Sequence, residues 1–152
     1  MIIASTLQKS FGPQTLFDDV SFLINKGERI GLVGKNGTGK STLFKMIMGE
    51  EKQDSGTLST PKGYKIGALD QHIHFTKPTV IDECIEALPT EKQWDHYKAE
   101  IILSGLGFSE QDFQKDPATF SGGFQVRINL CKALLADPNM LLLDEPTNYL
   151  DI

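Results

Sequence analysis

The chain has 152 residues, of which 39% are hydrophobic, and this is enough to build the core of one globular domain. It carries 15 basic and 20 acidic residues, and a net charge of -5 without a long basic block argues against a nucleic-acid-binding surface. The N-terminus lacks the features of a signal peptide, and no run approaches the roughly twenty apolar residues of a membrane span, so we expect a cytoplasmic protein.

The first part of the chain is predicted to form strands. Residues 2–7, 16–24 and 29–33 have the apolar or alternating patterns of strands. Phe11 lies between the first two strands, in a predicted loop before a Gly-Pro turn. Its flat ring is suited to stack on an adenine base, whereas an aromatic residue in a loop more often serves packing alone.

Residues 34–42 fit the phosphate-binding pattern G-x-x-x-x-G-K-[ST], between a predicted strand and a helix predicted over 43–48. Glycines let the backbone curl until its N–H groups point at a phosphate chain, with the positive end of the helix behind them. Lys40 is expected to reach the β and γ phosphates, and the Ser41 hydroxyl to bind Mg²⁺. A glycine-rich turn before an ordinary helix would not require the Gly-Lys-Ser triplet. The expected ATP-binding residues are Gly34, Lys35, Asn36, Gly37, Thr38, Gly39, Lys40, Ser41 and Thr42.

Two short strands and a helical stretch are predicted next. Residues 57–59 and 64–69 are the candidate strands, and Gln71 follows the second of them. Residues 79–104 have a helical pattern. Thr79, directly after a proline, is suited to cap the first helix of this stretch.

Other side chains of this region are expected to be structural. Thr90 and Gln93 form a capping-box pattern for a second helix. One face of that helix is expected to be packed, and it carries Trp94, Tyr97 and Ile101. The histidines show no metal-ligand spacing and are expected at the surface: His72, His74 and His96. Cys84 and Cys131 are far apart and outside any C-x-x-C motif, which favours buried reduced thiols over a disulfide or a metal site.

A Ser-Gly-Gly sequence precedes a helix predicted from 124 to 136. This start is a second helix N-terminus suited to bind an anion, although a serine N-cap with flexible neighbours would be the favoured explanation if the segment stood alone. The three residues are Ser121, Gly122 and Gly123. The predicted apolar face of the helix consists of Val126, Leu130, Ala133 and Leu134.

Residues 140–143 form a continuous apolar run, as expected for a strand buried on both faces of a parallel sheet. The run is followed by Asp144 and Glu145, at the strand end where such sheets bind ligands. Asp144 is suited to order the Mg²⁺ shell and Glu145 to polarise an attacking water. A solvated turn or a helix cap is the alternative, and the phosphate-binding loop in the same chain favours catalysis.

In this order, and along the whole chain, these segments resemble the ATP-binding cassette ATPases. The resemblance implies a partial α/β P-loop cassette that binds ATP and Mg²⁺. Its mixed β-sheet core is expected to combine an antiparallel β portion from the N-terminal strands with parallel strands at 30–33 and 140–143. The core would cover about 1–71 and 115–152, with a helical subdomain over about 72–114.

The resemblance also assigns roles to single residues. Phe11 takes the adenine-stacking position, residues 34–42 form the Walker A loop, and Gln71 senses Mg²⁺ and the γ-phosphate. Glu145 is the catalytic carboxylate, acting together with Lys40 and Gln71. The implied metal ligands are Ser41, Gln71 and Asp144.

In this family two cassettes pair head to tail, and the signature of each one completes the ATP site of its partner. Ser121, Gly122 and Gly123 match that signature, and Asp151 belongs to the D-loop that follows the Walker B strand. The partner cassette is expected in the same parent chain or in a homodimer. The family's switch histidine would lie beyond Ile152, so hydrolysis by these residues alone is expected to be impaired.

Details favour the membrane-free class F members, which carry two cassettes and act at the ribosome in translation or antibiotic protection. Phe124 and Arg127 stand in the signature helix, and Asn148 and Tyr149 follow Walker B, where transporters more often have other residues. We therefore expect the first cassette of a class F ATPase with the ribosome as its client. A transporter subunit, and a fragment that binds ATP or a partner cassette without turnover, are the alternatives.

Overall fold

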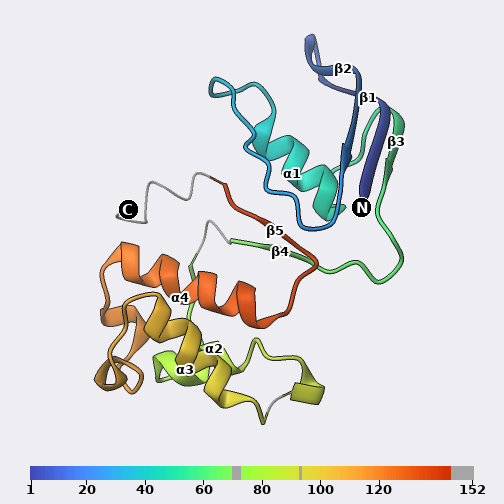
Figure 1. The fold of residues 1–152 in the computed structure, drawn as a ribbon. Coiled ribbons are helices and arrows are strands. Elements are labelled where there is room, and N and C mark those ends of the chain that lie inside the picture. Colours follow the sequence, from blue (N-terminus) through green and yellow to red (C-terminus); the bar gives the residue numbers. More distant parts are fainter. Residues whose placement is uncertain (70–72, 93, 145–152) are drawn as a thin grey trace. The chain divides into compact units, whose positions relative to one another are not determined.

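A computed structural model describes residues 1–69, 73–92 and 94–144 of the chain (Figure 1). The chain forms two compact units, Met1–Tyr64 and Lys65–Ile152, and each is described by itself. This division follows compactness and does not test the core and subdomain boundaries expected from the sequence, which stay a prediction. Within the described residues, no helix has the length and apolar character that a membrane crossing requires.

The first unit contains a three-stranded antiparallel sheet in the order β2-β1-β3 (Figure 1). The bounds are β1 (Ile2–Phe11), β2 (Gln14–Ile24) and β3 (Ser55–Ser59). The predicted antiparallel portion is therefore confirmed, with strands longer than expected. Phe11 is the last residue of β1, paired with Gln14, and so lies on a strand rather than in a loop.

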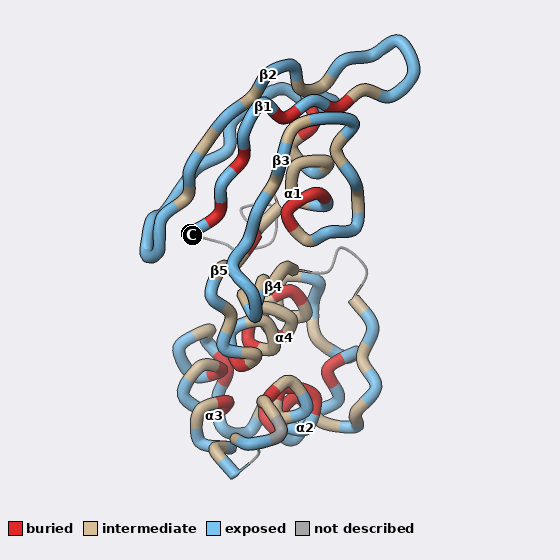
Figure 2. The backbone as a smooth tube through the Cα atoms, turned by 90° about the vertical axis from the view of Figure 1, so that its right-hand side faces the viewer, coloured by how far each residue is buried: buried red, intermediate tan, exposed pale blue. Residues whose placement is uncertain are grey.

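An irregularity in the middle of β1 decides which side chains are buried. The pairing of β1 with both neighbours shifts register around Thr6, whose φ is 48°. Before the shift Ile2 and Ala4 are buried, and after it Leu7 and Lys9 are buried (Figure 2). Because side chains alternate along a strand, one extra residue moves the odd-numbered positions onto the buried face.

Residues 29–33 do not form the predicted strand, and the expected parallel strand at 30–33 is therefore wrong. Their apolar side chains are exposed, to 59% for Ile30, 43% for Leu32 and 94% for Val33. A parallel strand needs a hydrogen-bonded neighbour, and no described residue pairs with this segment. An apolar pattern favours burial but does not supply that neighbour.

Helix α1 (Lys40–Met48) follows the glycine-rich loop and confirms the helix predicted there. It ends at Gly49, whose φ of 79° lets its N–H turn back to the carbonyl oxygens of Lys45 and Met46. Met46 and Ile47 are buried.

In its described residues, the second unit combines three α-helices with a short parallel strand pair (Figure 1). The bounds are β4 (Ile66–Ala68), α2 (Val80–Ile85), η1 (Thr90–Lys92), α3 (His96–Gly105), η2 (Glu110–Asp112), η3 (Pro117–Thr119), α4 (Gly122–Leu135) and β5 (Met140–Leu142). Thr79 caps α2 as predicted, because its hydroxyl accepts the Asp82 N–H. The two helices predicted in this stretch are present as α2 and α3, and between them lies Pro89, which lacks an N–H and disfavours a helical residue before it. The capping box expected at Thr90 and Gln93 lies partly outside the described residues.

The core of the second unit lies between α2, α3 and α4, which contact one another. Its fully buried side chains include Val80, Cys84, Leu103, Ile128 and Cys131. Both cysteines are free and buried, which confirms the prediction of reduced thiols. On α4 the buried residues are Val126, Ile128, Cys131 and Leu135, so the predicted apolar face was wrong in part, and Leu134 is 39% exposed.

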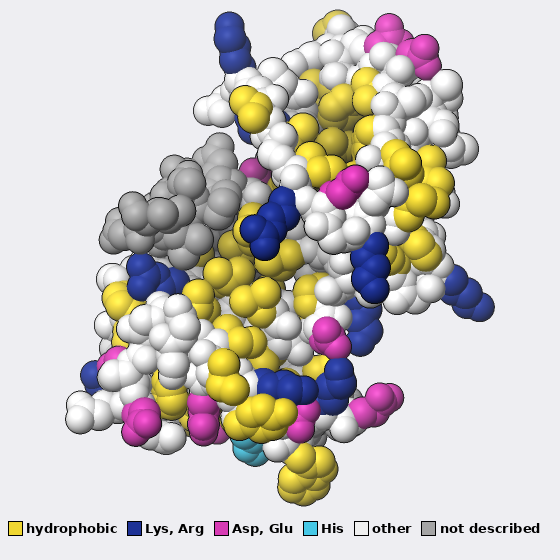
Figure 3. All heavy atoms as spheres, in the orientation of Figure 1, with side chains coloured by type: hydrophobic (Ala, Val, Ile, Leu, Met, Phe, Trp, Pro, Cys, Tyr) yellow, Lys and Arg dark blue, Asp and Glu magenta, His cyan; other side chains and the backbone are white. Residues whose placement is uncertain are grey.

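The face of α3 expected to be packed is instead at the surface. Trp94 is 91% exposed, Tyr97 55% and Ile101 64%. Figure 3 shows hydrophobic side chains at the surface of the second unit among charged ones. The core facing α3 is filled by Ala99 and Leu103, which occupy the opposite side of the helix. His74 and His96 are exposed as predicted, and His72 lies outside the described residues.

Candidate functional site

The glycine-rich loop has the conformation that its glycines were predicted to allow. Gly37 and Gly39 have φ values of 82° and 97°, in the left-handed region that L side chains rarely adopt. A Cβ on Gly39 would also lie 2.9 Å from Cζ of Phe17, and one on Gly34 would lie 2.7 Å from the Thr38 hydroxyl oxygen. Gly39 is the N-cap of α1 and makes no side-chain capping bond, so the helix begins directly behind the loop.

Lys40 folds back over this loop. Its ammonium donates hydrogen bonds to the carbonyl oxygens of Gly34, at 2.9 Å, and Lys35, at 3.0 Å. The Thr38 hydroxyl donates to the same Lys35 oxygen at 2.8 Å. No carboxylate among the described residues forms an ion pair with Lys40. The charge is thus held by two neutral oxygens, which phosphate oxygens can replace with a stronger, charge-assisted bond.

The β1–β2 hairpin packs against the loop. Gln14 donates from Nε2 to the Gly37 carbonyl oxygen at 3.4 Å, and Leu16 and Phe17 lie against Gly39. Phe11 is the strand partner of Gln14, and its side chain is 49% exposed. The hairpin end that carries the Phe11 ring is therefore attached to the phosphate-binding loop. Sequence reasoning missed Gln14, because a glutamine beside a turn carries no distinctive signal.

Two predicted Mg²⁺ ligands lie within the described residues. Ser41 is in the first turn of α1, and Asp144 follows β5 at the carboxyl end of the parallel pair. Hydroxyl and carboxylate oxygens are the ligands that Mg²⁺ prefers. The two residues belong to different units, and Gln71, Glu145 and Asp151 lie outside the described residues. In the described part of the chain, no three His, Cys, Asp or Glu residues cluster as a preformed metal site.

The Ser-Gly-Gly segment lies at the start of α4, as predicted. Ser121 is the N-cap residue, but its side chain makes no capping bond, so it does not act as an ordinary serine cap. Both Ser121 and Gly122 are exposed, and a Cβ on Gly122 would meet only open space. Gly123 follows as the second helical residue. The start of α4 is thus open to an external group at Ser121 and Gly122.

The segment before this helix start is held by packing in its own unit. The Phe108 ring makes edge contacts with Phe120 and Phe124, at centroid distances of 5.5 and 5.1 Å. Arg127 donates to the Leu106 carbonyl oxygen at 3.2 Å and lies 4.8 Å from the centre of the Phe124 ring. Phe124 and Arg127, which favoured class F in the sequence, therefore support the position of the Ser-Gly-Gly segment.

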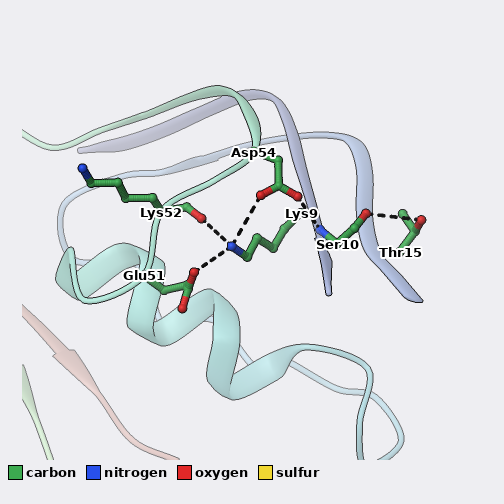
Figure 4. Close-up of polar contacts among 6 residues, drawn as sticks. All are labelled: Lys9, Ser10, Thr15, Glu51, Lys52 and Asp54. Atoms are coloured by element: carbon green, nitrogen blue, oxygen red, sulfur yellow. Dashed lines mark hydrogen bonds and ion pairs between the residues drawn. The ribbon is translucent and has the colours of Figure 1, made fainter. Parts of the chain in front are cut away.

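A buried lysine in the first unit was missed by sequence reasoning (Figure 4). The Lys9 ammonium donates to Glu51 Oε1 at 2.6 Å and to the Lys52 carbonyl oxygen at 2.8 Å, and it lies 3.5 Å from Asp54 Oδ1. The hydrogen bond to Glu51 raises the pKa of Lys9, and the same bond lowers the pKa of Glu51. The acidic residues just after α1 were a signal for such a partner, but the β1 register shift that buries Lys9 was not predictable.

Comparison with known proteins places these features in one family. A family model described as ABC transporter matches residues 17–148. The energy-dependent translational throttle protein EttA of Escherichia coli (strain K12) is 41% identical over 97% of this chain. The uncharacterized ABC transporter ATP-binding protein YfmM of Bacillus subtilis (strain 168) is 34% identical over 95% of it. The chain spans only 27% of EttA and 36% of YfmM.

Solved structures agree on the fold. The dimeric structure of MJ0796, a bacterial ABC transporter cassette, matches 99% of this chain with a TM-score of 0.76 and 24% identity, and the chain covers 76% of that structure. The family-model match over residues 17–148 includes the glycine-rich loop and the strand that precedes Asp144. The chain therefore belongs to the ABC transporter family and has the fold of its ATP-binding cassettes.

Proposed function

We propose that this chain binds Mg-ATP through residues 34–42 and serves as the cassette of a class F ATPase that acts at the ribosome. The observation that carries nucleotide binding is the Lys40 ammonium, held over the glycine-rich loop by two carbonyl oxygens. The left-handed Gly37 and Gly39 and the N-terminus of α1 add donors suited to a phosphate chain. These features fit the β and γ phosphates of a nucleotide.

The remaining proposed roles combine the chemistry of the residues with what the family resemblance implies. Ser41, Gln71 and Asp144 are the residues that would supply oxygen ligands to Mg²⁺, and Phe11 would stack on the base. Glu145 polarises the attacking water. Bound Mg²⁺ neutralises charge on the transferred phosphoryl group.

The signature completes the site of a second cassette. Ser121, Gly122 and Gly123 are exposed or partly exposed at the start of α4, where an added phosphate would meet a helix N-terminus. The solved dimeric cassette supports such a pair. In this arrangement one cassette alone lacks the donors that its partner provides, so a chain without a partner turns over slowly. Asp151 would lie in the D-loop beside this interface.

The ribosome is proposed as the client because EttA, a translational throttle protein, matches almost the whole chain. The test uses the longest gene product that contains this chain, with Glu145→Gln to retain bound ATP. We expect it to sediment with ribosomes in sucrose gradients when ATP is present, and to leave them when Lys40→Ala is added to the same protein. Failure to sediment with ribosomes in the presence of ATP would contradict the proposed client, and sedimentation independent of both ATP and Lys40 would contradict its control by ATP.

A transporter subunit is the second candidate, favoured by the name of YfmM, an ABC transporter ATP-binding protein. The same gene product separates the two candidates by fractionation. If it is recovered with membranes, and alkaline carbonate releases it as a peripheral subunit, the transporter function is correct. If the protein binds ATP with no phosphate release in either fraction, it is the non-catalytic binding module.

A further inference from the structure

The Lys9 cation, near the C-terminal end of β1, lies against the residue proposed to stack on the base. Lys9 Nζ is 4.7 Å from the centre of the Phe11 ring. Lys9 and Phe11 are two residues apart on β1 after the register shift at Thr6, so both side chains leave the strand on the same face. A cation at this distance is attracted by the negative face of an aromatic ring.

Hydrogen bonds fix the position of the Lys9 ammonium beside the Phe11 ring. Lys9 is only 7% exposed, and each of its three N–H donors has an oxygen nearby, from Glu51, Lys52 or Asp54 (Figure 4). The second oxygen of Asp54 accepts the Ser10 N–H at 2.7 Å, so Asp54 also holds the strand between Lys9 and Phe11. A lysine with this many partners has little freedom to move away from the ring.

The same partners connect the ring to the helix behind the phosphate-binding loop. The N–H of Glu51 donates to the Lys45 carbonyl oxygen in the last turn of α1, at 3.2 Å. The N-terminus of α1 therefore adjoins the loop. Its C-terminal turn contacts Glu51, Glu51 accepts a hydrogen bond from Lys9, and Lys9 contacts the Phe11 ring. This path lies within a single compact unit.

We propose that Lys9 is a positioning residue for the nucleotide base: it covers one face of the Phe11 ring and fixes the ring, so that the base stacks on the other face. The Phe11 side chain, 49% exposed, retains surface for that contact. A ring fixed in advance loses less side-chain entropy when a ligand binds. The inference rests on the proposed function, because it requires that Phe11 contacts the base.

The test compares Mg-ATP with Mg-triphosphate, which lacks the base, in binding titrations of the 152-residue chain. Lys9→Met keeps an unbranched side chain of similar length but removes the charge. We expect it to weaken Mg-ATP about fivefold and to leave Mg-triphosphate unchanged. Lys52→Met is the matched control, since only the backbone carbonyl of Lys52 takes part. It should bind both ligands as the original chain does.

A double-mutant cycle decides whether Lys9 acts through the ring. In a Phe11→Ala background, Lys9→Met should cause no further loss of Mg-ATP affinity. If Lys9→Met instead weakens both ligands equally, or adds its full effect to Phe11→Ala, then Lys9 only supports the fold and the proposal is wrong.

Lys9→Met leaves two carboxylates without their cation. If this variant does not fold, a second variant tests the proposal. Glu51→Gln keeps the ammonium with its other two partners and should cause a smaller loss that is again selective for Mg-ATP. An equal effect on both ligands in Glu51→Gln would overturn the proposal. Failure of the proposed function itself would give a different result. The unaltered chain would then bind no Mg-ATP, or Phe11→Ala would keep the selectivity of the unaltered chain for Mg-ATP over Mg-triphosphate.

Discussion

Glu83 on α2 and Lys132 on α4 form an ion pair whose carboxylate is fully buried. The other Glu83 oxygen accepts the backbone N–H groups of Thr76 and Lys77, at 2.8 and 2.9 Å. Burial acts to raise the pKa of Glu83, but Lys132 and the two N–H groups outweigh it and hold the pKa below its usual value. The pair joins two helices that carry the core of the second unit.

Glu83→Gln should destabilise the chain by roughly 3 kcal/mol, because it leaves the Lys132 charge without its partner in a mostly buried position. Glu86→Gln, on the same helix end, removes only a half-exposed ion pair with Lys77 and should have little effect. Urea denaturation followed by circular dichroism measures both variants. Equal midpoints for the two would show that the buried pair contributes no more than a surface pair.

The Asp112 carboxyl should titrate far below its usual pKa of 3.8. Its hydrogen bond with Lys115, supported by the Ser109 hydroxyl and N–H, lowers the pKa to about 2. A depressed carboxyl pKa stabilises the folded state above the usual value, and this contribution is lost as the pH falls through about 2. NMR titration of the side-chain carboxyl carbon measures it, and Lys115→Met should move the midpoint upward. A midpoint near 3.8 in the unaltered chain would contradict the structure.

Gly56→Ala should destabilise the first unit more than Gly63→Ala does. Both glycines have positive φ, 80° and 75°, which costs an alanine about 1 to 2 kcal/mol at either site. Only at Gly56 would the new Cβ also lie 2.2 Å from the Thr6 carbonyl oxygen, at the register shift of β1. Thermal unfolding compares the two variants. If both variants melt at the same temperature, the close approach of Gly56 on β3 to the Thr6 carbonyl oxygen does not affect the cost of the substitution.

Local chemistry made much of the site predictable from sequence. The glycine-rich loop, the helix after it, the Thr79 cap and the start of α4 all depend on residues a few positions apart, and all were confirmed. The separation of residues 79–104 into two helices was likewise predicted from local caps, and Pro89 lies between the two helices, α2 and α3.

What escaped prediction depends on distant partners. Residues 29–33 have a strand's composition, but no described strand pairs with them. Lys9 is buried because of a register shift in β1, which is accommodated by a glycine on another strand. Trp94 and Tyr97 have the spacing of a packed face, yet Ala99 and Leu103 point α3 the other way. Hydrophobic pattern alone does not tell which apolar face meets the core.

Phosphate release by the chain should be slow and should rise faster than linearly with protein concentration, because a second copy must supply Ser121, Gly122 and Gly123 to complete each site. Glu145→Gln should abolish release while Mg-ATP still binds. A malachite-green assay over a concentration series measures this. Release linear in protein concentration at a fast rate would show that one chain holds a complete catalytic site.

The most direct test of the central claim is the affinity of Lys40→Ala for Mg-ATP, measured by isothermal titration calorimetry beside Lys45→Ala. Both lysines belong to α1, but only Lys40 lies over the glycine-rich loop. We predict that Lys40→Ala weakens Mg-ATP about tenfold or more, because a charge-assisted bond to phosphate is lost, and that Lys45→Ala binds like the original chain. Equal affinities in all three proteins would contradict a nucleotide site at residues 34–42.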